Sequence, residues 1–504
     1  MNAPVAKKML PAGFEDITQK VVQKSYERAK KKKVEKDDGT TSWEEQRFSD
    51  GEQEAIKHIM HHVVVYQGHF LTCFSDNKPV VGNDLRATID VCAMHTLALS
   101  RGKIAHVLQR APITFQRYAY YPGFPRFLLV DGATCYNTWH PAQRLQVSDS
   151  QLKQWMSGKR SALVVAKDFE VDGRTKAVEA FLLETFPRIW RVMLRMLFGN
   201  ENSPTASPNW IEEHEVFTKW FACVVHKPLD RIRWAPVLRG AHGIGKGTFQ
   251  YLAQALMGSG SVRTVHNLEG IAGQFAGENA LTRLLVVDEV WSKSGKAMEQ
   301  FKPIISEDYV QVERKGEQRF STRAVHDTIV FSNHHTPFTV AETERRWWVT
   351  AYRDYDMEVD ASRELKQAFH AEGNRLIREA LPLSPSGNQD QIRDLLCWLK
   401  LVAATVPPSF FAVAPSSFGL TELVDTVASE AYDDITTWLS SLGARDALSL
   451  DQVVTSSGIP QGELKPLLSK YGFRNCQMKR EGNRKVWTKA APGTGPNTLV
   501  TYLS

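Results

Sequence analysis

The sequence predicts an α/β protein with a largely parallel β-sheet, built around a phosphate-binding loop (a P-loop). Short apolar runs alternate with helical spacers from about residue 232 to 352, which is the pattern of strands joined by crossover helices. A glycine-rich stretch follows the first of these runs, and a later run ends in two neighbouring carboxylates. An α+β N-terminal region is expected before this core, and a C-terminal winged-helix domain after it.

Length and composition are those of an ordinary globular protein. The 504 residues, 42% hydrophobic and 23% charged, leave room for about three domains. The apolar runs are too short for a membrane span, and the N-terminus lacks the apolar stretch of a secretion signal. We therefore expect a cytoplasmic protein with no membrane partner. The net charge of +6 is compatible with an anionic partner but does not require one.

Five segments are expected along the chain. A basic run at 30–33, followed by acidic residues and a Gly-Thr-Thr-Ser stretch, suggests a flexible tail. Its lysines suit either a solvated surface or non-specific contact with nucleic acid. The expected divisions are the tail at 1–54, an accessory region at 55–200, the sheet core at 201–380, a linker with a helical connection at 381–433, and the winged helix at 434–504.

The segment at 235–257 has the order strand, glycine-rich loop, helix, which a nucleotide phosphate site requires. Glycines let backbone N–H groups turn toward an anion, and the helix N-terminus adds partial positive charge. Gly247 stands where such a loop has a hydroxyl, so the Mg²⁺-side hydroxyl is assigned to Thr248. The predicted residues for ATP and Mg²⁺ are Gly240, Gly243, Gly245, Lys246, Gly247 and Thr248, with Lys246 reaching the β- and γ-phosphates.

Two carboxylates, Asp288 and Glu289, end a second apolar strand. An aspartate there can hold Mg²⁺ through water, and the adjacent glutamate can orient and deprotonate an attacking water. The pair therefore favours hydrolysis of a nucleoside triphosphate. The loop also resembles that of adenylate kinases, which transfer phosphate between nucleotides, so a nucleotide kinase is the first alternative. A kinase has no need of an activated water.

Polar residues accompany two further strands. Asn333 follows one of them, where an amide can bind the attacking water or the γ-phosphate, although such an Asn is often only a turn residue. Arg345 and Arg346 precede another. One of them could reach a neighbouring subunit's γ-phosphate and stabilise transition-state charge, and the alternative is a surface arginine or an ion pair.

Residues 309–322 have the pattern of two short strands around a tight turn. Arg314, Lys315 and Arg319 stand near the tip. Basic residues there would contact nucleic-acid phosphates without distinguishing sequence, and the alternative is an ordinary solvated hairpin.

Five features follow one another within about 110 residues: the phosphate loop, VVDE, the lysine-tipped hairpin, a strand ending in SN, and the arginine pair. This order resembles the superfamily 3 helicases, and more closely the helicase half of phage primase-helicase proteins. FKPIISEDYVQVERKG, IVFSNHHTPF and ERRWWVT fit that subgroup, as do YYPGFPRFLL and CYNTWHP upstream.

The resemblance implies an AAA+ motor that forms a ring, expected to be a homo-hexamer, and moves on single-stranded DNA by hydrolysing ATP. By position, Lys246 and Thr248 bind nucleotide and Mg²⁺, and Asp288 and Glu289 are the acidic pair. Asn333 is the polar sensor, Arg346 is favoured over Arg345 as the finger supplied in trans, and Lys315 is the DNA contact in the pore. Lys302 also matches a lysine of the subgroup, but no role is assigned to it.

Many such proteins carry a primase domain before the helicase. Asp168, Glu170 and Asp172 could mimic its metal-binding motif, but the region before them is short, and a surface acidic turn is the favoured interpretation. Any primase or polymerase that works with this chain is then a separate protein.

The C-terminal region shows helical patterns at 434–442, 449–457 and 461–471, followed by two strand-like arms around a turn at 481–483. Three helices and a hairpin suggest a winged helix. Arg480, Arg484 and Lys485 at the wing could bind duplex phosphates. The alternative is a protein-interaction domain with a solvated basic edge.

Together these features predict an ATP-dependent DNA helicase of phage-type replication, with single-stranded and forked DNA as its partner. Its location would be the bacterial host cytoplasm if a phage or prophage encodes it. Two alternatives stay open. One is the nucleotide kinase with its GKGT loop, and the other is a DNA-binding replication initiator whose ATP site only switches assembly.

Overall fold

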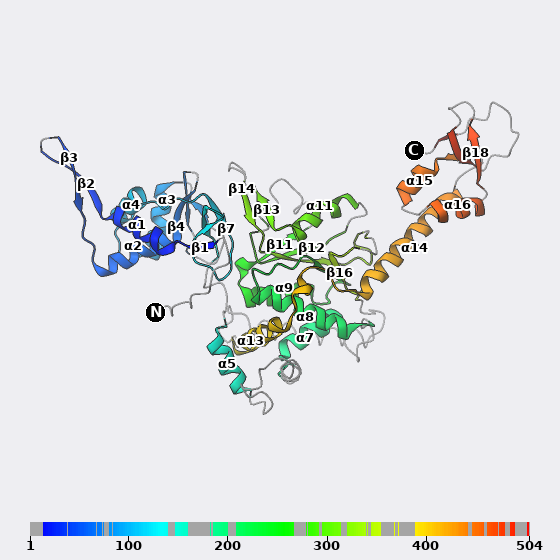
Figure 1. The fold of residues 1–504 in the computed structure, drawn as a ribbon, viewed down its shortest axis with the longest axis horizontal. Helices are drawn as coiled ribbons and strands as arrows, with labels where there is room; N and C mark the ends of the chain where they lie inside the picture. The colour runs from blue at the N-terminus through cyan, green and yellow to red at the C-terminus, as the bar shows by residue number, and fades with distance from the viewer. Residues whose placement is uncertain are drawn as a thin grey trace.

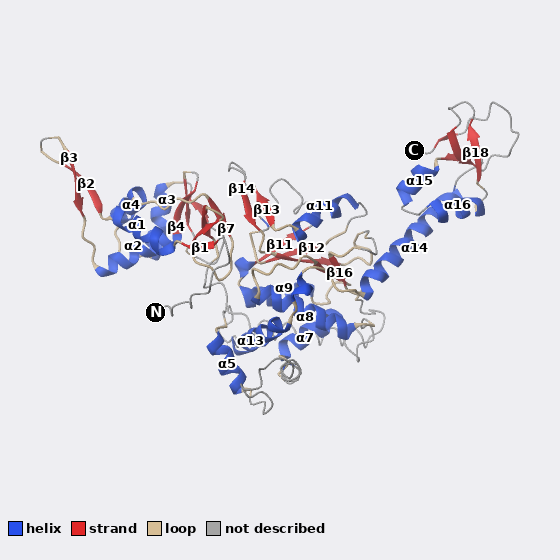
Figure 2. Cartoon of the chain, in the orientation of Figure 1, coloured by secondary structure: helices blue, strands red, loops and turns tan. Residues whose placement is uncertain are grey.

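The fold is taken from a computed structural model. It describes residues 14–37, 39–66, 68–72, 74, 80–82, 84–139, 147–159, 182, 185–199, 208–266, 279, 281–291, 295–313, 320–338, 340, 344–353, 367, 371, 389–441, 446–457, 461–471, 473–478, 484–488 and 501–502. Figures 1 and 2 show three groups of elements: an N-terminal group, a central sheet with its helices, and a C-terminal group at the end of a long helix.

Residues 14–139 form an α+β unit. It contains a four-stranded sheet in the order β1-β8-β9-β7, a three-stranded sheet β4-β5-β6, and a hairpin β2-β3. The helices are α1 (Thr18–Ala29), α2 (Asp50–His62), α3 (Leu85–His95) and α4 (Arg101–Arg110). The strands are β1 (Phe14–Asp16), β2 (Lys31–Glu35), β3 (Thr41–Glu45), β4 (Val63–Tyr66), β5 (His69–Thr72), β6 (Val80–Gly82), β7 (Arg117–Ala119), β8 (Phe127–Val130) and β9 (Ala133–Asn137).

The expectation of a flexible tail at 1–54 is wrong for residues 14–37 and 39–54. Helix α1 buries Val22, Tyr26 and Ala29 in the apolar core of this unit. Three lysines of the run lie in β2, and β3 places carboxylates opposite two of them: Lys31 faces Glu45 and Lys32 faces Glu44 across the hairpin. Cross-strand opposite charges stabilise a two-stranded hairpin that a lysine run alone would not form. Residues 1–13 lie outside the described residues.

The central sheet has five strands, all parallel, in the order β11-β12-β15-β10-β16. They are β10 (Ala235–Arg239), β11 (Val262–His266), β12 (Leu284–Asp288), β15 (Asp327–Ser332) and β16 (Trp347–Val349). Every residue of β10, β15 and β16 is buried. Continuous burial of this kind indicates a parallel sheet covered on both faces, and it confirms the largely parallel α/β core.

Helices cover both faces of this sheet (Figure 1). One face packs on α7 (Arg188–Phe198), α8 (Trp210–His226), α9 (Lys246–Met257) and α13 (Gln389–Thr405), with α5 (Asp149–Gly158) beside them. The other face packs on α11 (Gly295–Ser306) and on α14 (Phe418–Ser441). Short 3₁₀ turns lie at Ser259–Ser261 and Pro408–Phe411.

The predicted hairpin within the core is present. Strands β13 (Tyr309–Val312) and β14 (Phe320–Arg323) pair antiparallel, with Tyr309 opposite Arg323. Arg117 of the N-terminal unit donates a hydrogen bond to the Ser321 carbonyl at 3.0 Å, which ties β14 to that unit. The tip, with Arg314, Lys315 and Arg319, lies outside the described residues.

Beyond α14, a small unit gathers around Leu439, Leu464 and Trp487. Its elements are β17 (Asp446–Leu448), α15 (Leu450–Ser457), α16 (Gln461–Lys470), β18 (Arg474–Met478), β19 (Arg484–Thr488) and β20 (Thr501–Tyr502). The strands form one sheet in the order β18-β19-β17-β20. In the part of the chain that the structure describes, no helix is both long and apolar enough to cross a membrane.

Candidate nucleotide site at the carboxyl edge of the sheet

The strand order brings three predicted site segments to one edge. Strand β15 lies between β10 and β12, and all three run in the same direction. The glycine loop follows β10, Asn333 follows β15, and Asp288 ends β12. Asn333 therefore lies between the loop and the acidic pair. Ligands of open parallel sheets bind outside the carboxyl ends of the strands, which is the edge that these residues share.

The glycine loop has a backbone that only glycine adopts easily at two critical positions. Gly240 has φ +157°, and a Cβ there would lie 2.4 Å from the Arg353 carbonyl oxygen. Gly245 has φ +105° and caps the N-terminus of α9. Left-handed backbone at this cap turns the chain into the helix. The first turn of α9, which begins at Lys246, then presents its free N–H groups beside the loop.

Lys246 is held by its own loop. Its side chain is buried, and Nζ donates to the carbonyls of Gly240 at 2.5 Å and Ala241 at 3.2 Å. Burial lowers the pKa of Lys246 to about 8, and the charge of Asp288 opposes that shift. The ammonium group and the Asp288 carboxylate are therefore close enough to interact.

The acidic pair has a strained backbone. Glu289 has φ +57°, which is uncommon for a residue other than glycine. Its backbone N–H donates to Asp288 Oδ1 at 2.9 Å. Ser332 Oγ donates to the Val290 carbonyl at 2.7 Å, so the next strand holds this turn in place. Left-handed strain that the surroundings impose on a non-glycine residue is found preferentially at functional sites.

Asn333 has a buried polar atom without a partner. Its side-chain Oδ1 accepts no hydrogen bond from the described residues. Its backbone carbonyl accepts from the Tyr352 hydroxyl at 3.1 Å. A buried amide oxygen left unpaired costs about 1–3 kcal/mol, so such atoms are rare unless a ligand or water pairs with them.

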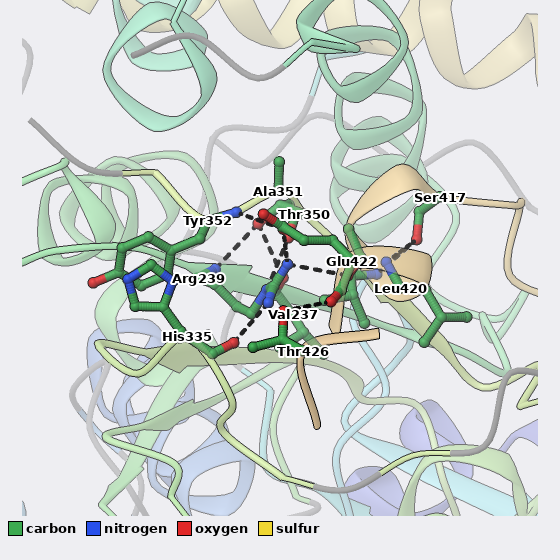
Figure 3. Close-up of polar contacts among 12 residues, drawn as sticks. Val237, Arg239, His335, Thr350, Ala351, Tyr352, Ser417, Leu420, Glu422 and Thr426 are labelled. Atoms are coloured by element: carbon green, nitrogen blue, oxygen red, sulfur yellow. Dashed lines mark hydrogen bonds and ion pairs between the residues drawn. The ribbon is translucent and has the colours of Figure 1, made fainter. Parts of the chain in front are cut away.

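Arg239, which the sequence analysis missed, fixes the strand that leads into the loop (Figure 3). Its side chain is 1% exposed and forms an ion pair with Glu422 of α14 at 2.5 Å. Its other N–H groups donate to the carbonyls of Thr350 at 2.9 Å and His335 at 2.6 Å. The sequence shows that an arginine ends this apolar strand. It does not show that Glu422 is the partner of that arginine.

The Glu422 carboxylate also accepts from the Tyr352 backbone N–H at 3.2 Å. Tyr352 in turn contacts the backbone of Asn333 and stacks on His335 at 3.3 Å between ring centroids. The start of α14 is thereby linked to the segment that carries Asn333.

The two arginines do not join this site. Arg345 and Arg346 precede β16, and Ala235 at the start of β10 lies opposite Trp347. They are therefore at the amino edge of the sheet, about 20 Å along the strands from Gly240. Arg346 forms an ion pair with Glu344 at 3.0 Å, whereas Arg345 is exposed.

The remaining predicted residues have mixed outcomes. Gly247 and Thr248 lie in the first turn of α9, and Gly247 is exposed. The assignment of the Thr248 hydroxyl to Mg²⁺ stays a prediction. Arg484 and Lys485 lie in β19, opposite Met478 and Gln477. Residues 160–181 and 479–483 lie outside the described residues, and with them Asp168, Glu170, Asp172 and Arg480.

Comparisons with known proteins give distant similarities. A family model described as "Family of unknown function (DUF5906)" matches residues 238–346, from β10 to the arginine pair. No curated protein matches the chain. The apo structure of the NrS-1 C-terminal region is similar at 14% identity with a TM-score of 0.45, covering 84% of this chain and 95% of that chain. JCV helicase bound to an acetamide compound is similar at 12% identity with a TM-score of 0.21, covering 56% of this chain and 73% of that chain. At these identities and TM-scores, the function must be inferred from the chain's own residues.

Proposed function

We propose that the chain hydrolyses ATP at the carboxyl edge of its central sheet and uses that reaction to move on DNA as a helicase. The observation that carries the proposal is the position of Asn333, which follows the strand between the glycine loop and the acidic pair and whose buried Oδ1 accepts no hydrogen bond from the described residues. Triphosphate hydrolysis uses such groups at one edge: a phosphate loop, a lysine, two carboxylates and an amide whose oxygen can still accept a hydrogen bond.

The residues fit ATP and Mg²⁺. The loop N–H groups and Lys246 would hold the phosphates, with Lys246 exchanging its carbonyl partners for phosphate oxygens. Thr248 and Asp288 would hold Mg²⁺, which would supply charge neutralisation at the phosphate oxygens. The unpaired Asn333 oxygen supports the fit, because a bound water or ligand group would satisfy it.

Glu289 is the residue proposed to act on water. It is exposed at the end of β12, and its neighbour Asp288 is only half-buried. A carboxylate at this position can accept the proton of an attacking water, while the Asn333 amide orients that water. A kinase must exclude water from its phosphate site, so an exposed Glu289 favours hydrolysis over the nucleotide kinase.

DNA is proposed as the second substrate on two features of the fold. The β13–β14 hairpin is inserted between β12 and β15 of the central sheet, and the sequence between its strands has basic residues. The order α14, β17, α15, α16, β18, β19 suits a winged helix with Arg484 and Lys485 on the wing. Together with the resemblance to superfamily 3 helicases, these features support a ring on single-stranded DNA, expected to be a hexamer.

The test follows the fate of the γ-phosphate. Reaction in ¹⁸O-labelled water should yield labelled inorganic phosphate, and Glu289→Gln should bind ATP but release phosphate at least 100-fold more slowly. Glu215→Gln on α8, at an exposed ion pair, is the matched control. Transfer of phosphate to a nucleoside monophosphate would instead support the kinase. DNA unwinding by Glu289→Gln at the wild-type rate would support the assembly switch.

A further inference from the structure

A charged cluster at the amino edge of the sheet joins residues from two elements. Lys302 lies on α11, and Glu344 and Arg346 lie just before β16. The neighbouring residues fix these elements together, because Phe301 and Trp347 are both fully buried with ring centroids 5.4 Å apart. The charged groups therefore extend from a rigid base.

Glu344 uses both carboxylate oxygens to bridge the two basic side chains. Oε2 pairs with Lys302 Nζ at 2.8 Å, and Oε1 accepts from Arg346 Nη1 at 3.0 Å and from the Arg346 backbone N–H at 3.1 Å. The Glu344 side chain is 9% exposed, whereas that of Arg346 is 28% exposed. Burial raises the pKa of Glu344, but the hydrogen bonds from Lys302 and Arg346 outweigh it, so the pKa is below its usual value.

This arrangement differs from an ordinary surface ion pair. An exposed ion pair leaves both side chains mobile and contributes little to the free energy of unfolding. Here the carboxylate is nearly buried and binds Arg346 at two points, which restricts both the backbone and the side chain of the arginine. Arg345, one residue earlier, is exposed, and its guanidinium forms no hydrogen bond or ion pair with the described residues.

We propose that Lys302 and Glu344 are positioning residues that hold the Arg346 guanidinium ready for the nucleotide site of a neighbouring copy of the chain. The inference rests on the proposed function. Arg346 is about 20 Å along the strands from its own glycine loop, so only a second copy can use it there. A guanidinium supplied in this way stabilises transition-state charge, and its benefit depends on its position.

The first experiment separates positioning from binding. Glu344→Gln and Lys302→Met should lower kcat for ATP hydrolysis about 10–100-fold with KM little changed, because a misplaced group costs the reaction rather than ground-state binding. Lys302→Arg keeps the charge and should retain most of the rate. Asp394→Asn is the matched control, because Asp394 also bridges two donors, Trp155 and Lys159, but far along the chain from this cluster. Thermal unfolding and size-exclusion chromatography check folding and assembly.

The second experiment mixes an inactive variant, Lys246→Ala, with an impaired one, Glu344→Gln. A Lys246→Ala subunit has an intact Arg346 cluster, and a Glu344→Gln subunit has an intact phosphate loop. Mixed assemblies therefore contain complete sites between unlike copies, and the hydrolysis rate should exceed the sum of the two variants alone.

Three results would overturn the inference. If Glu344→Gln hydrolyses ATP with the same kcat as Asp394→Asn, Glu344 has no positioning role, while the proposed function stands. Lost activity without recovery on mixing means that the cluster acts within its own subunit. A wild-type chain that does not hydrolyse ATP refutes the proposed function itself.

Discussion

Two glycines on either side of Lys246 should respond in opposite ways to the same substitution. Gly245 has φ +105°, and a Cβ there would lie 3.1 Å from Cε of Met196. Gly247 has ordinary helical backbone, with nothing within 4 Å of a Cβ. Gly245→Ala therefore introduces backbone strain, and Gly247→Ala replaces a poor helix former with the best one.

The magnitudes follow from the backbone alone. A left-handed alanine costs about 1–2 kcal/mol. The Cβ of Met196 lies 3.2 Å from the new atom, so displacing that residue would add to this cost. Alanine in place of glycine within a helix gains up to about 1 kcal/mol. The two variants should therefore differ by about 1–3 kcal/mol, which is roughly 2–12 °C in Tm for a core of this size.

The assay is thermal unfolding followed by tryptophan fluorescence, because Trp190, Trp220 and Trp234 of the core are fully buried. Fluorescent ATP-analogue binding is measured beside it. Gly247→Ala should bind nucleotide and unfold at the wild-type temperature or above, whereas Gly245→Ala should lose both stability and binding. Equal Tm values, or a Gly247→Ala variant that is the less stable of the two, would refute this description of the loop.

Three further predictions concern strain, charge and packing around the site. Glu289→Gly should raise stability by about 1 kcal/mol, because it removes a left-handed glutamate at φ +57°, while hydrolysis is lost. ATP affinity, measured by titration, should be highest below pH 8 and fall above it, because burial lowers the pKa of Lys246 to about 8 and the neutral amine binds phosphate poorly. Gly419→Ala should loosen α14 from β16 at a cost of about 1–3 kcal/mol and speed limited proteolysis of α14, because a Cβ would lie 2.2 Å from the Thr350 carbonyl.

Each of these has a result that contradicts it. A Glu289→Gly variant less stable than wild type would mean that the left-handed backbone carries no strain. ATP affinity that is flat between pH 7 and pH 9.5 would mean that the burial of Lys246 has no effect on binding. A Gly419→Ala variant with unchanged proteolysis would show that the contact between α14 and the sheet is loose.

The strand, glycine loop and helix at 235–257 and the strand that ends in Asp288 were predictable because their determinants are local. Gly240, Gly245 and Lys246 lie within one short segment between an apolar run and a helical pattern, so periodicity and spacing identify them. The position of Asn333 between the loop and Asp288 was different, because it depends on the order of strands in the sheet. Strand order depends on long-range pairing that no single segment encodes.

The interactions that the sequence analysis missed join residues that lie far apart along the chain. Arg239 is fixed by Glu422, which lies 183 residues further along the chain. Glu344 and Lys302 meet only because α11 packs against the start of β16. The lysine run at 30–33 was interpreted as part of a tail because only its charge was considered. Two other features, the apolar face of α1 and the acidic strand β3 opposite Lys31, indicate folded structure.

The most direct test of the proposed function is the rate of phosphate release from ATP by the purified chain, with and without single-stranded DNA, beside Lys246→Ala. Lys246 is buried at the start of α9 and belongs to none of the strands of the sheet. Hydrolysis that rises with DNA and disappears in Lys246→Ala is the predicted result. Hydrolysis that is indifferent to DNA, or absent from the wild-type chain, would contradict a DNA-driven motor.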